Sequence, residues 1–206
     1  MFKKITQTSV FILLFAFSAL LRAESVGYET ISPAQPTHDT TKVEVIEFFW
    51  YGCPHCYDFE PLLNKWKETL PKNVEFIHQP AAFNETWSKH AKAYYTAEAL
   101  GVVDKIHADF FEAVQKKGEE LQTEEQLTKF FVAHGVKEAD FHEAYNSFPV
   151  DAKLRQSGAM AARYGITGVP AIVVNGKYRV TGKTAGSHEK MIEVMNKLIA
   201  QESGKK

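Results

Sequence analysis

The sequence predicts an α/β fold in which an all-helical insertion interrupts a single domain. Two short segments, 42–50 and 74–78, carry the β-branched and aromatic residues typical of strands. Helical periodicity then runs to residue 164, and the chain closes with a strand, a turn, a strand and a helix. We therefore expect 24–81 and 158–206 to form one discontinuous α/β domain and 82–157 to form the insertion.

The first predicted strand is followed closely by a helix. Residues 42–50 read KVEVIEFFW and become apolar on both faces, as in a central strand covered by helices. Gly52 turns the chain, and Pro54 suits the first helical position, where its missing N–H group costs nothing. Pro61 is expected to kink the helix, because it removes a hydrogen bond to the carbonyl of Tyr57. The residues expected on the buried face of this helix recur every three or four positions and end before Pro71. They are Cys56, Phe59, Leu63, Trp66 and Leu70.

Five helices are predicted in the middle of the chain. Thr123 and Gln126 form a capping-box pattern at the start of the third. Their aromatic residues are interpreted as the insertion's own core, with a substrate groove as the alternative: Phe110, Phe111, Phe130, Phe131 and Phe141. The predicted helical ranges are 88–100, 104–117, 123–134, 137–146 and 151–164.

The closing segment contains the strongest turn pattern of the chain. Asn175-Gly176 separates two short strands, 172–174 and 177–180, and this dipeptide favours a tight hairpin. Ser187 is placed to cap the last helix, whose apolar face can pack on the sheet. Pro170 opens the first of these strands, where a missing N–H group is tolerated.

Residues 1–23 have the pattern of a secretory signal peptide. Lys3 and Lys4 precede an apolar stretch that is too short to span a membrane comfortably and that ends near Ala23. Cleavage after Ala23, or within a couple of residues of it, also removes Arg22 and leaves 21 basic against 25 acidic residues, a net charge of −4. This balance favours neither nucleic acid nor an anionic membrane as a partner. Export would place the cysteines in an oxidising compartment.

The only two cysteines of the chain form the motif Cys53-Pro54-His55-Cys56 where the first strand gives way to the helix. A disulfide that closes so short a loop restrains the unfolded chain little, so the pair suits thiol exchange better than structural stability. A zinc site would need two further ligands, and no second CxxC motif or closely spaced histidine pair is present. Covalent haem attachment would need a histidine directly after Cys56, where Tyr57 stands.

The position of each cysteine suggests its role. Cys53 lies at the helix N-terminus, where unpaired N–H groups and the helix dipole favour a thiolate, whereas Cys56 lies on the buried face of the first turn. We therefore expect Cys53 to be the attacking thiol and Cys56 the resolving one. His55 could stabilise the Cys53 thiolate by charge or hydrogen bond; the alternative is a solvated turn histidine.

Glu47 is an acid in the middle of the apolar strand, six positions before Cys53. Carboxylates are rarely buried without a partner. If Glu47 points beneath the CxxC turn, burial raises its pKa and makes it a proton acceptor for Cys56 through a water molecule. The alternative is a glutamate that faces a polar patch at the sheet edge.

These motifs resemble the DsbA family of thiol oxidases, which have a thioredoxin-like fold with a helical insertion. EFFWYGCPHCYDFEP resembles the active-site segment of the family, and GVPAIVVNGKY resembles its cis-proline strand and hairpin. The resemblance implies that Cys53, Cys56, His55 and Glu47 are catalytic and that Val169-Pro170 is a cis pair that binds substrate. Glu60 matches a second charged position near the site, while Gly52 and Pro61 depart from the family pattern. The close match covers about 41–66 and 158–182.

The resemblance implies a periplasmic protein thiol:disulfide oxidoreductase that introduces disulfide bonds into exported proteins. Reduced, unfolded polypeptides would be its substrates, and an inner-membrane DsbB-type protein linked to quinone would reoxidise it. We expect a monomer with no metal and no cofactor besides the Cys53–Cys56 disulfide. The alternatives are a disulfide isomerase or reductant, and a peptide-binding periplasmic chaperone.

Overall fold

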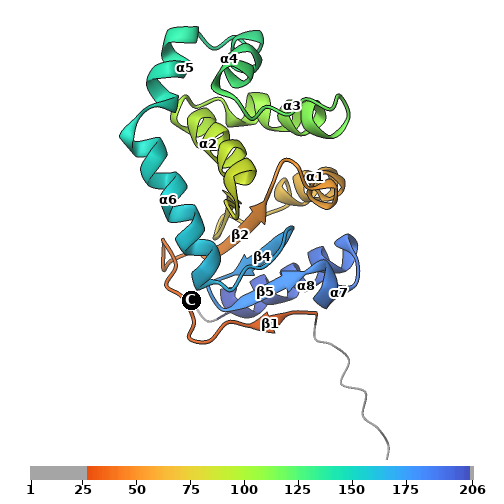
Figure 1. Cartoon of the computed structure of the whole chain (residues 1–206). Coiled ribbons are helices and arrows are strands. Elements are labelled where there is room, and N and C mark those ends of the chain that lie inside the picture. The colour runs from red at the N-terminus through yellow and green to blue at the C-terminus, as the bar shows by residue number, and fades with distance from the viewer. Residues whose placement is uncertain (1–26, 205–206) are drawn as a thin grey trace, which may run out of the picture.

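A five-stranded sheet lies at the centre of the computed structural model, which describes residues 27–204 (Figure 1). The strand order is β1-β5-β4-β2-β3; β2 and β3 are parallel, and every other neighbouring pair is antiparallel. This confirms the α/β fold class. The predicted signal peptide lies outside the described residues. The strands are β1 (Glu29–Thr30), β2 (Val43–Phe49), β3 (Val74–Pro80), β4 (Ala171–Val174) and β5 (Tyr178–Thr181).

The helices follow the predicted order. Helices α2 and α6 begin three residues earlier than predicted, and the short helix α7 was not predicted. The side chain of Asn84 accepts a hydrogen bond from Trp87 N at 3.0 Å and starts α2 before residue 88. Ser147 caps α6 in the same way, so that Phe148 belongs to its first turn. The helices are α1 (Pro54–Lys67), α2 (Glu85–Ala99), α3 (Val103–Gln115), α4 (Glu124–Ala133), α5 (Glu138–Tyr145), α6 (Phe148–Arg163), α7 (Gly182–Ala185) and α8 (His188–Ser203).

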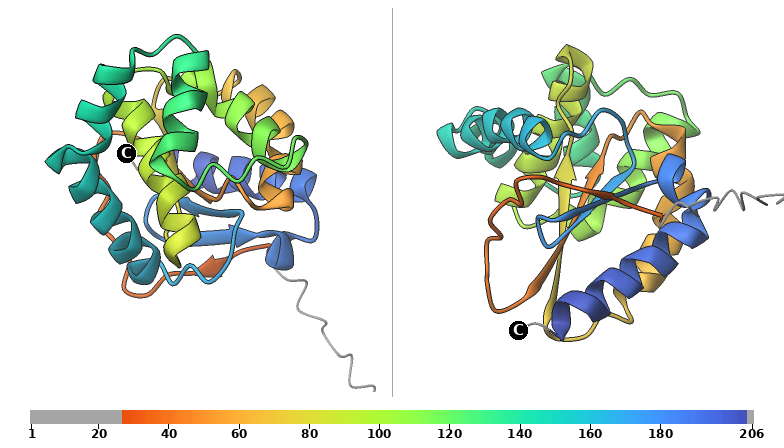
Figure 2. Two further views of the ribbon diagram at one scale, coloured as in Figure 1. Left: turned by 45° about the horizontal axis from the view of Figure 1, so that its top comes forward. Right: turned by 90° about the horizontal axis from the view of Figure 1, so that it is seen from below.

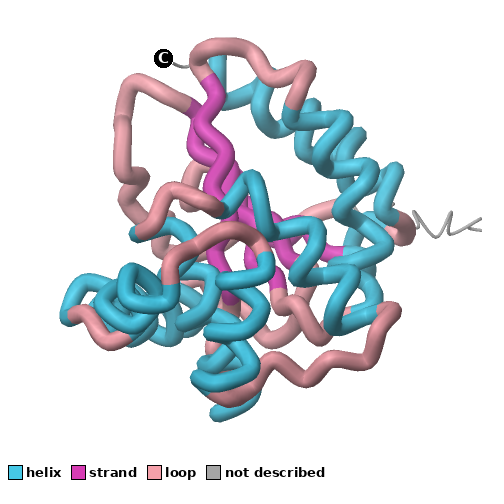
Figure 3. Tube along the Cα trace, turned by 90° about the horizontal axis from the view of Figure 1, so that it is seen from above, coloured by secondary structure: helices cyan, strands magenta, loops and turns pink. Residues whose placement is uncertain are grey.

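Helices cover both faces of the sheet (Figures 2 and 3). Side chains alternate along β2, so that Val43 and Val45 face α1 and α8, whereas Ile46 and Phe48 face the end of α6. Because β2 lies between β4 and β3 and is buried along its whole length, it is the central strand that its sequence predicted.

Helices α2–α5 gather on one side of the sheet, beyond the end of β2 that leads into α1 (Figure 1). The five phenylalanines expected in the insertion are all buried. They do not form a separate core, because the same cluster includes Phe49, Tyr51, Cys53 and Cys56. The ring of Tyr51 lies 4.1 Å from that of Phe110 and 4.8 Å from that of Phe111, measured between centroids. The insertion thus packs directly on the CxxC turn.

The boundary expected at residues 157–158 lies inside α6, which runs without a break from the insertion to the sheet. The division of the chain into two domains therefore stays a prediction. Helix α1 likewise continues through Pro61. Among residues 27–204, no helix has both the length and the apolar character needed to cross a membrane.

The local turn and cap predictions are confirmed. Asn175 and Gly176 have φ values of 52° and 66°, the left-handed pair that a tight hairpin turn requires. Thr123 and Gln126 form the expected capping box, and Ser187 accepts a hydrogen bond from Lys190 N at 3.2 Å at the start of α8. The Val169–Pro170 peptide bond is cis.

Candidate active site

Cys53 is the N-cap residue of α1, and the chain reaches it from the central strand through a tight turn. The N–H group of Cys53 donates to Trp50 O at 2.9 Å, and its carbonyl accepts from Tyr57 N at 3.1 Å. Gly52 fits this turn because a Cβ atom at position 52 would overlap the ring of Trp50. Both cysteines are free thiols; Cys53 is 9% exposed and Cys56 is fully buried.

The two thiols have opposite electrostatic environments. Hydrogen bonds from the Cys56 thiol and from the backbone N–H groups of Cys56 and His55, with a smaller contribution from the charge of His55, outweigh burial and lower the pKa of Cys53 to about 6. Burial raises the pKa of Cys56 well above its usual range, and the negative charges of Cys53 and Glu47 add to this effect. At neutral pH, Cys53 is therefore a thiolate while Cys56 stays protonated.

The cis-proline segment lies against the nucleophile although it is more than a hundred residues away in sequence. Cys53 Sγ contacts Val169 O at 3.5 Å. His55 is exposed and lines the same cavity as Val169 and Pro170. The structure thus brings the distant pair Val169 and Pro170 to the CxxC turn, next to Cys53 and His55.

Glu47 lies on the face of the central strand that is covered by α1, and only 1% of its surface is exposed. Because β2 is an interior strand, the sheet-edge interpretation of Glu47 is wrong. Its Oε2 atom lies 2.9 Å from Nδ1 of His78, and its Oε1 atom has no hydrogen-bond partner. Burial, together with the negative charge of Glu60, raises the pKa of Glu47 well above its usual range. A carboxyl group in this environment keeps its proton to a higher pH than an exposed one.

A second set of polar groups is buried around Glu60. Glu60 Oε1 accepts from Asn64 Nδ2 at 3.0 Å and lies 3.4 Å from His107 Nε2. Burial opposes ionisation of Glu60, but the ion pair with His107, the charge of Lys67 and the hydrogen bond from Asn64 outweigh it and lower the pKa of the carboxyl. Sequence analysis did not anticipate His78 or His107. The position of His78 in a parallel strand directly beside Glu47 was the one available signal.

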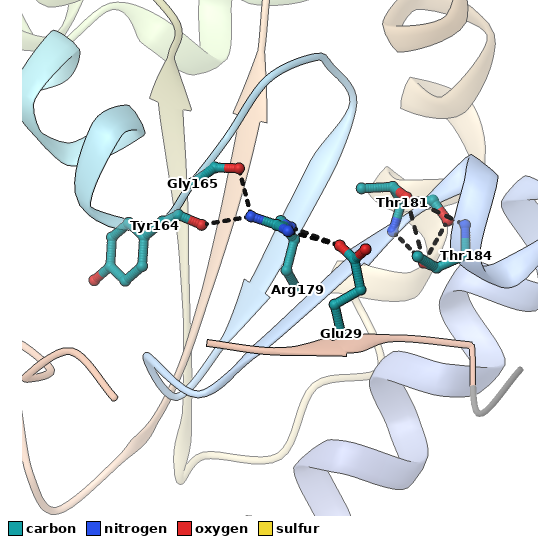
Figure 4. A network of polar contacts seen from close by, with 6 residues as sticks. All are labelled: Glu29, Tyr164, Gly165, Arg179, Thr181 and Thr184. Carbon is teal, nitrogen blue, oxygen red and sulfur yellow. Dashed lines mark hydrogen bonds and ion pairs between the residues drawn. The ribbon is translucent and has the colours of Figure 1, made fainter. Parts of the chain in front are cut away.

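A cavity of about 760 Å³ opens beside His55 and the cis-proline segment. Arg179 of β5 is one of its lining residues. It donates hydrogen bonds to Glu29 Oε2 and to the carbonyls of Tyr164 and Gly165 (Figure 4). Thr181 and Thr184 form a capping box at the wall of the cavity, where β5 passes into α7. We call this cavity the groove. It lies next to Cys53, because Val169, which lines it, contacts Sγ of Cys53. Its volume could hold several side chains of a peptide.

Two cysteines with opposite pKa shifts in the first turn of a helix, beside a cis-proline segment, define a thiol-disulfide oxidoreductase with the thioredoxin fold. The model of the DSBA-like thioredoxin domain family matches residues 44–188 of this chain. A thiol:disulfide interchange protein DsbA of Pseudomonas syringae pv. tomato is 43% identical over 175 residues, which cover 85% of this chain and 82% of that protein. The DsbA protein of Azotobacter vinelandii is 42% identical over 84% of this chain and 88% of its own length.

Solved structures agree with this assignment. The crystal structure of Pseudomonas aeruginosa DsbA superposes with a TM-score of 0.83 at 39% identity, over 87% of this chain and 95% of that one. This chain belongs to the DsbA family of thiol:disulfide oxidoreductases.

Replacing His55 tests the electrostatic stabilisation of Cys53. We expect His55→Ala to raise the pKa of Cys53 from about 6 toward the ~8.5 of a free thiol, because a nearby positive charge is lost. The ultraviolet absorbance of the thiolate, followed through a pH titration of the reduced protein, measures this shift. His142→Ala is the control, since His142 is paired with Glu124 on a different helix. Superimposable curves for His55→Ala and the wild type would make His55 a solvated turn residue.

Proposed function

We propose that this chain oxidises reduced, unfolded polypeptides after their export to the periplasm, by donating the Cys53–Cys56 disulfide. The observation that carries the proposal is the opposite protonation of the two thiols: a Cys53 pKa of about 6 beside a Cys56 pKa well above its usual range. Donation leaves both cysteines reduced. It is favoured when the reduced enzyme is stabilised, as it is by a Cys53 thiolate at a helix N-terminus.

The reaction balances as two exchanges. A substrate thiolate attacks Sγ of Cys53, the Cys53–Cys56 bond breaks, and Cys56 leaves as a thiolate that takes up one proton. A second substrate thiolate then attacks the substrate sulfur of the mixed disulfide, so that the substrate disulfide forms and Cys53 departs as a thiolate. The protein needs no cofactor for these steps, because the disulfide itself carries the two electrons.

Glu47 is proposed to exchange the Cys56 proton through a water molecule. Its raised pKa allows it to give a proton to the Cys56 thiolate during donation and to accept one when the enzyme is reoxidised. The partner that removes the electrons is proposed to be an inner-membrane DsbB-type protein linked to quinone.

Val169 and Pro170 are proposed to bind the substrate backbone next to Cys53. Val169 O already lies 3.5 Å from the nucleophile, and an extended peptide could pair with this segment as an added strand. The cavity beside His55 would then receive substrate side chains. The helical segment 82–157 is proposed to be an insertion domain that covers the CxxC turn and shares its core with it.

Oxidation of a reduced model peptide tests the proposed activity. The oxidised wild type should convert the peptide to its disulfide with stoichiometric loss of its own disulfide, because donation is favoured. Cys53→Ser should give no product. Reduction of insulin in the presence of dithiothreitol serves as the parallel assay. A protein that reduces insulin rapidly and fails to oxidise the peptide is a reductant, which contradicts the proposal.

Glu47→Gln should slow peptide oxidation by about tenfold or more, because the amide keeps the shape of the carboxyl but cannot exchange a proton, and positioned general bases contribute about 10²–10⁴-fold. Stopped-flow fluorescence under single-turnover conditions gives the rate. Glu44→Gln is a matched control: Glu44 is a buried glutamate of the same strand that alternates to the opposite face. A Glu47→Gln rate equal to that of the wild type at every pH would remove Glu47 from the proton path.

The reduced form should melt at a higher temperature than the disulfide form at neutral pH. The folded pKa of Cys53, about 6, is depressed below its unfolded value of ~8.5, so its stabilising contribution is full above ~8.5 and is lost as the pH falls through about 6. Cys56 contributes little, because it is protonated in both the folded and the unfolded state. Thermal melts of both forms should therefore show a gap that closes between about pH 8 and about pH 5. An oxidised form that melts higher throughout would indicate a reductant with a stable disulfide.

A further inference from the structure

Three potential metal ligands converge beneath the CxxC turn, outside the residues that handle the disulfide. Glu60 comes from α1, His78 from β3 and His107 from α3. One ligand atom of each lies within 4.8 Å of the others. Glu60 and His107 are 6% and 7% exposed, and the side chain of His78 is 11% exposed. Such a group of two imidazoles and one carboxylate matches the donor set of three-ligand zinc sites.

The hydrogen bonds of the two histidines orient them as ligands. Nδ1 of His78 is paired with Glu47 Oε2 at 2.9 Å, and Nδ1 of His107 is paired with Tyr51 Oη at 2.7 Å. Because Nδ1 of each ring is used in this way, the Nε2 atoms of both histidines face the interior of the cluster. In metalloproteins, a histidine ligand is held in this way by a carboxylate or another polar group on its second nitrogen.

Two of the ligand atoms have no hydrogen-bond partner. His107 Nε2 and Glu60 Oε2 are both buried, and the one close contact between these two side chains is the 3.4 Å approach of His107 Nε2 to Glu60 Oε1. Buried polar atoms are costly when they lack hydrogen bonds, so atoms that converge on one small space favour a cation bound between them.

The side chain of Lys67 brings a positive charge to this cluster. Its Nζ atom lies 3.1 Å from Nε2 of His78, so that an ammonium group already occupies the cation position at one ligand. Lys67 is half-buried near the end of α1 and carries a long, flexible side chain, which can move toward solvent and open the cluster.

We propose that Glu60, His78 and His107 form a binding site for a divalent transition-metal ion of the Zn²⁺ type, which replaces the Lys67 ammonium. The nitrogen and oxygen donors favour Zn²⁺ or Co²⁺ over Mg²⁺ and Ca²⁺, which prefer oxygen donors alone. Glu47 and Tyr51 serve as the outer-shell partners that hold the two imidazoles.

Metal titration of the untagged mature protein in its disulfide form tests the site, since neither cysteine can then act as a ligand. Co²⁺ is followed by its visible absorption and Zn²⁺ by calorimetry. We expect one ion per chain, and binding weakened by about 100-fold or more in His107→Ala, because even outer-shell changes cost about 10–100-fold. Lys67→Met should bind more tightly than the wild type, because the competing ammonium is gone.

His142→Ala is the matched control, because His142 lies between Glu124 and Glu138 at the surface and could hold an ion there. Its affinity should equal that of the wild type. If circular dichroism shows that His107→Ala does not fold, two other variants decide the question. Glu60→Gln should bind the metal more weakly than the wild type, and Lys67→Met should bind it more tightly. Absence of binding, affinity unchanged in both Glu60→Gln and Lys67→Met, or loss of binding in His142→Ala would overturn the proposal.

Discussion

The aromatic contact between the helical insertion and the CxxC turn is the interaction on which the rest of the site depends. Tyr51 and Phe49 leave the central strand and pack among Phe110 and Phe111 of α3. This cluster closes over Cys56 and removes it from water. Desolvation is the largest contribution to the raised pKa of Cys56, so the packing of the insertion around Cys56 supports the Cys56 side of the difference between the two thiols.

The same burial affects Glu47 in the central strand and raises the pKa of its carboxyl. Glu47 cannot reach solvent, and its only hydrogen-bond partner among the described residues is His78. A carboxyl in this setting resists ionisation, and one next to a buried thiol suits proton exchange better than charge stabilisation. Glu60 lies one helical turn after Cys56 and behaves in the opposite way, because His107 and Asn64 support its charged form. The pKa values of the two acids beneath the turn thus shift in opposite directions because their partners differ.

The groove beside Cys53 is built from segments that are distant in sequence. β1 is only two residues long, yet its Glu29 holds Arg179, which in turn ties β5 to the end of α6. The cis-proline loop lies between these elements and His55. A substrate there would meet charged walls, since Glu29, Arg179, Lys183 and Glu189 all line the cavity.

Most elements and the chemistry of the CxxC motif could be predicted from the sequence, because they depend on neighbours in the chain; the short β1 and α7 were not predicted. A run of β-branched and aromatic residues identified β2, the Asn175-Gly176 pair identified the hairpin, and caps such as Thr123 and Ser187 indicated helix starts. Asn84 and Ser147 carried the same signal for α2 and α6. The groups that meet beneath the turn could not be predicted, because they come together through the packing of distant segments. Glu60, His78 and His107 belong to three different elements, and no local pattern encodes their approach. Burial and charge pairing act through space, so the tertiary packing set the pKa values of Glu47 and Cys56 and created the cluster beside them.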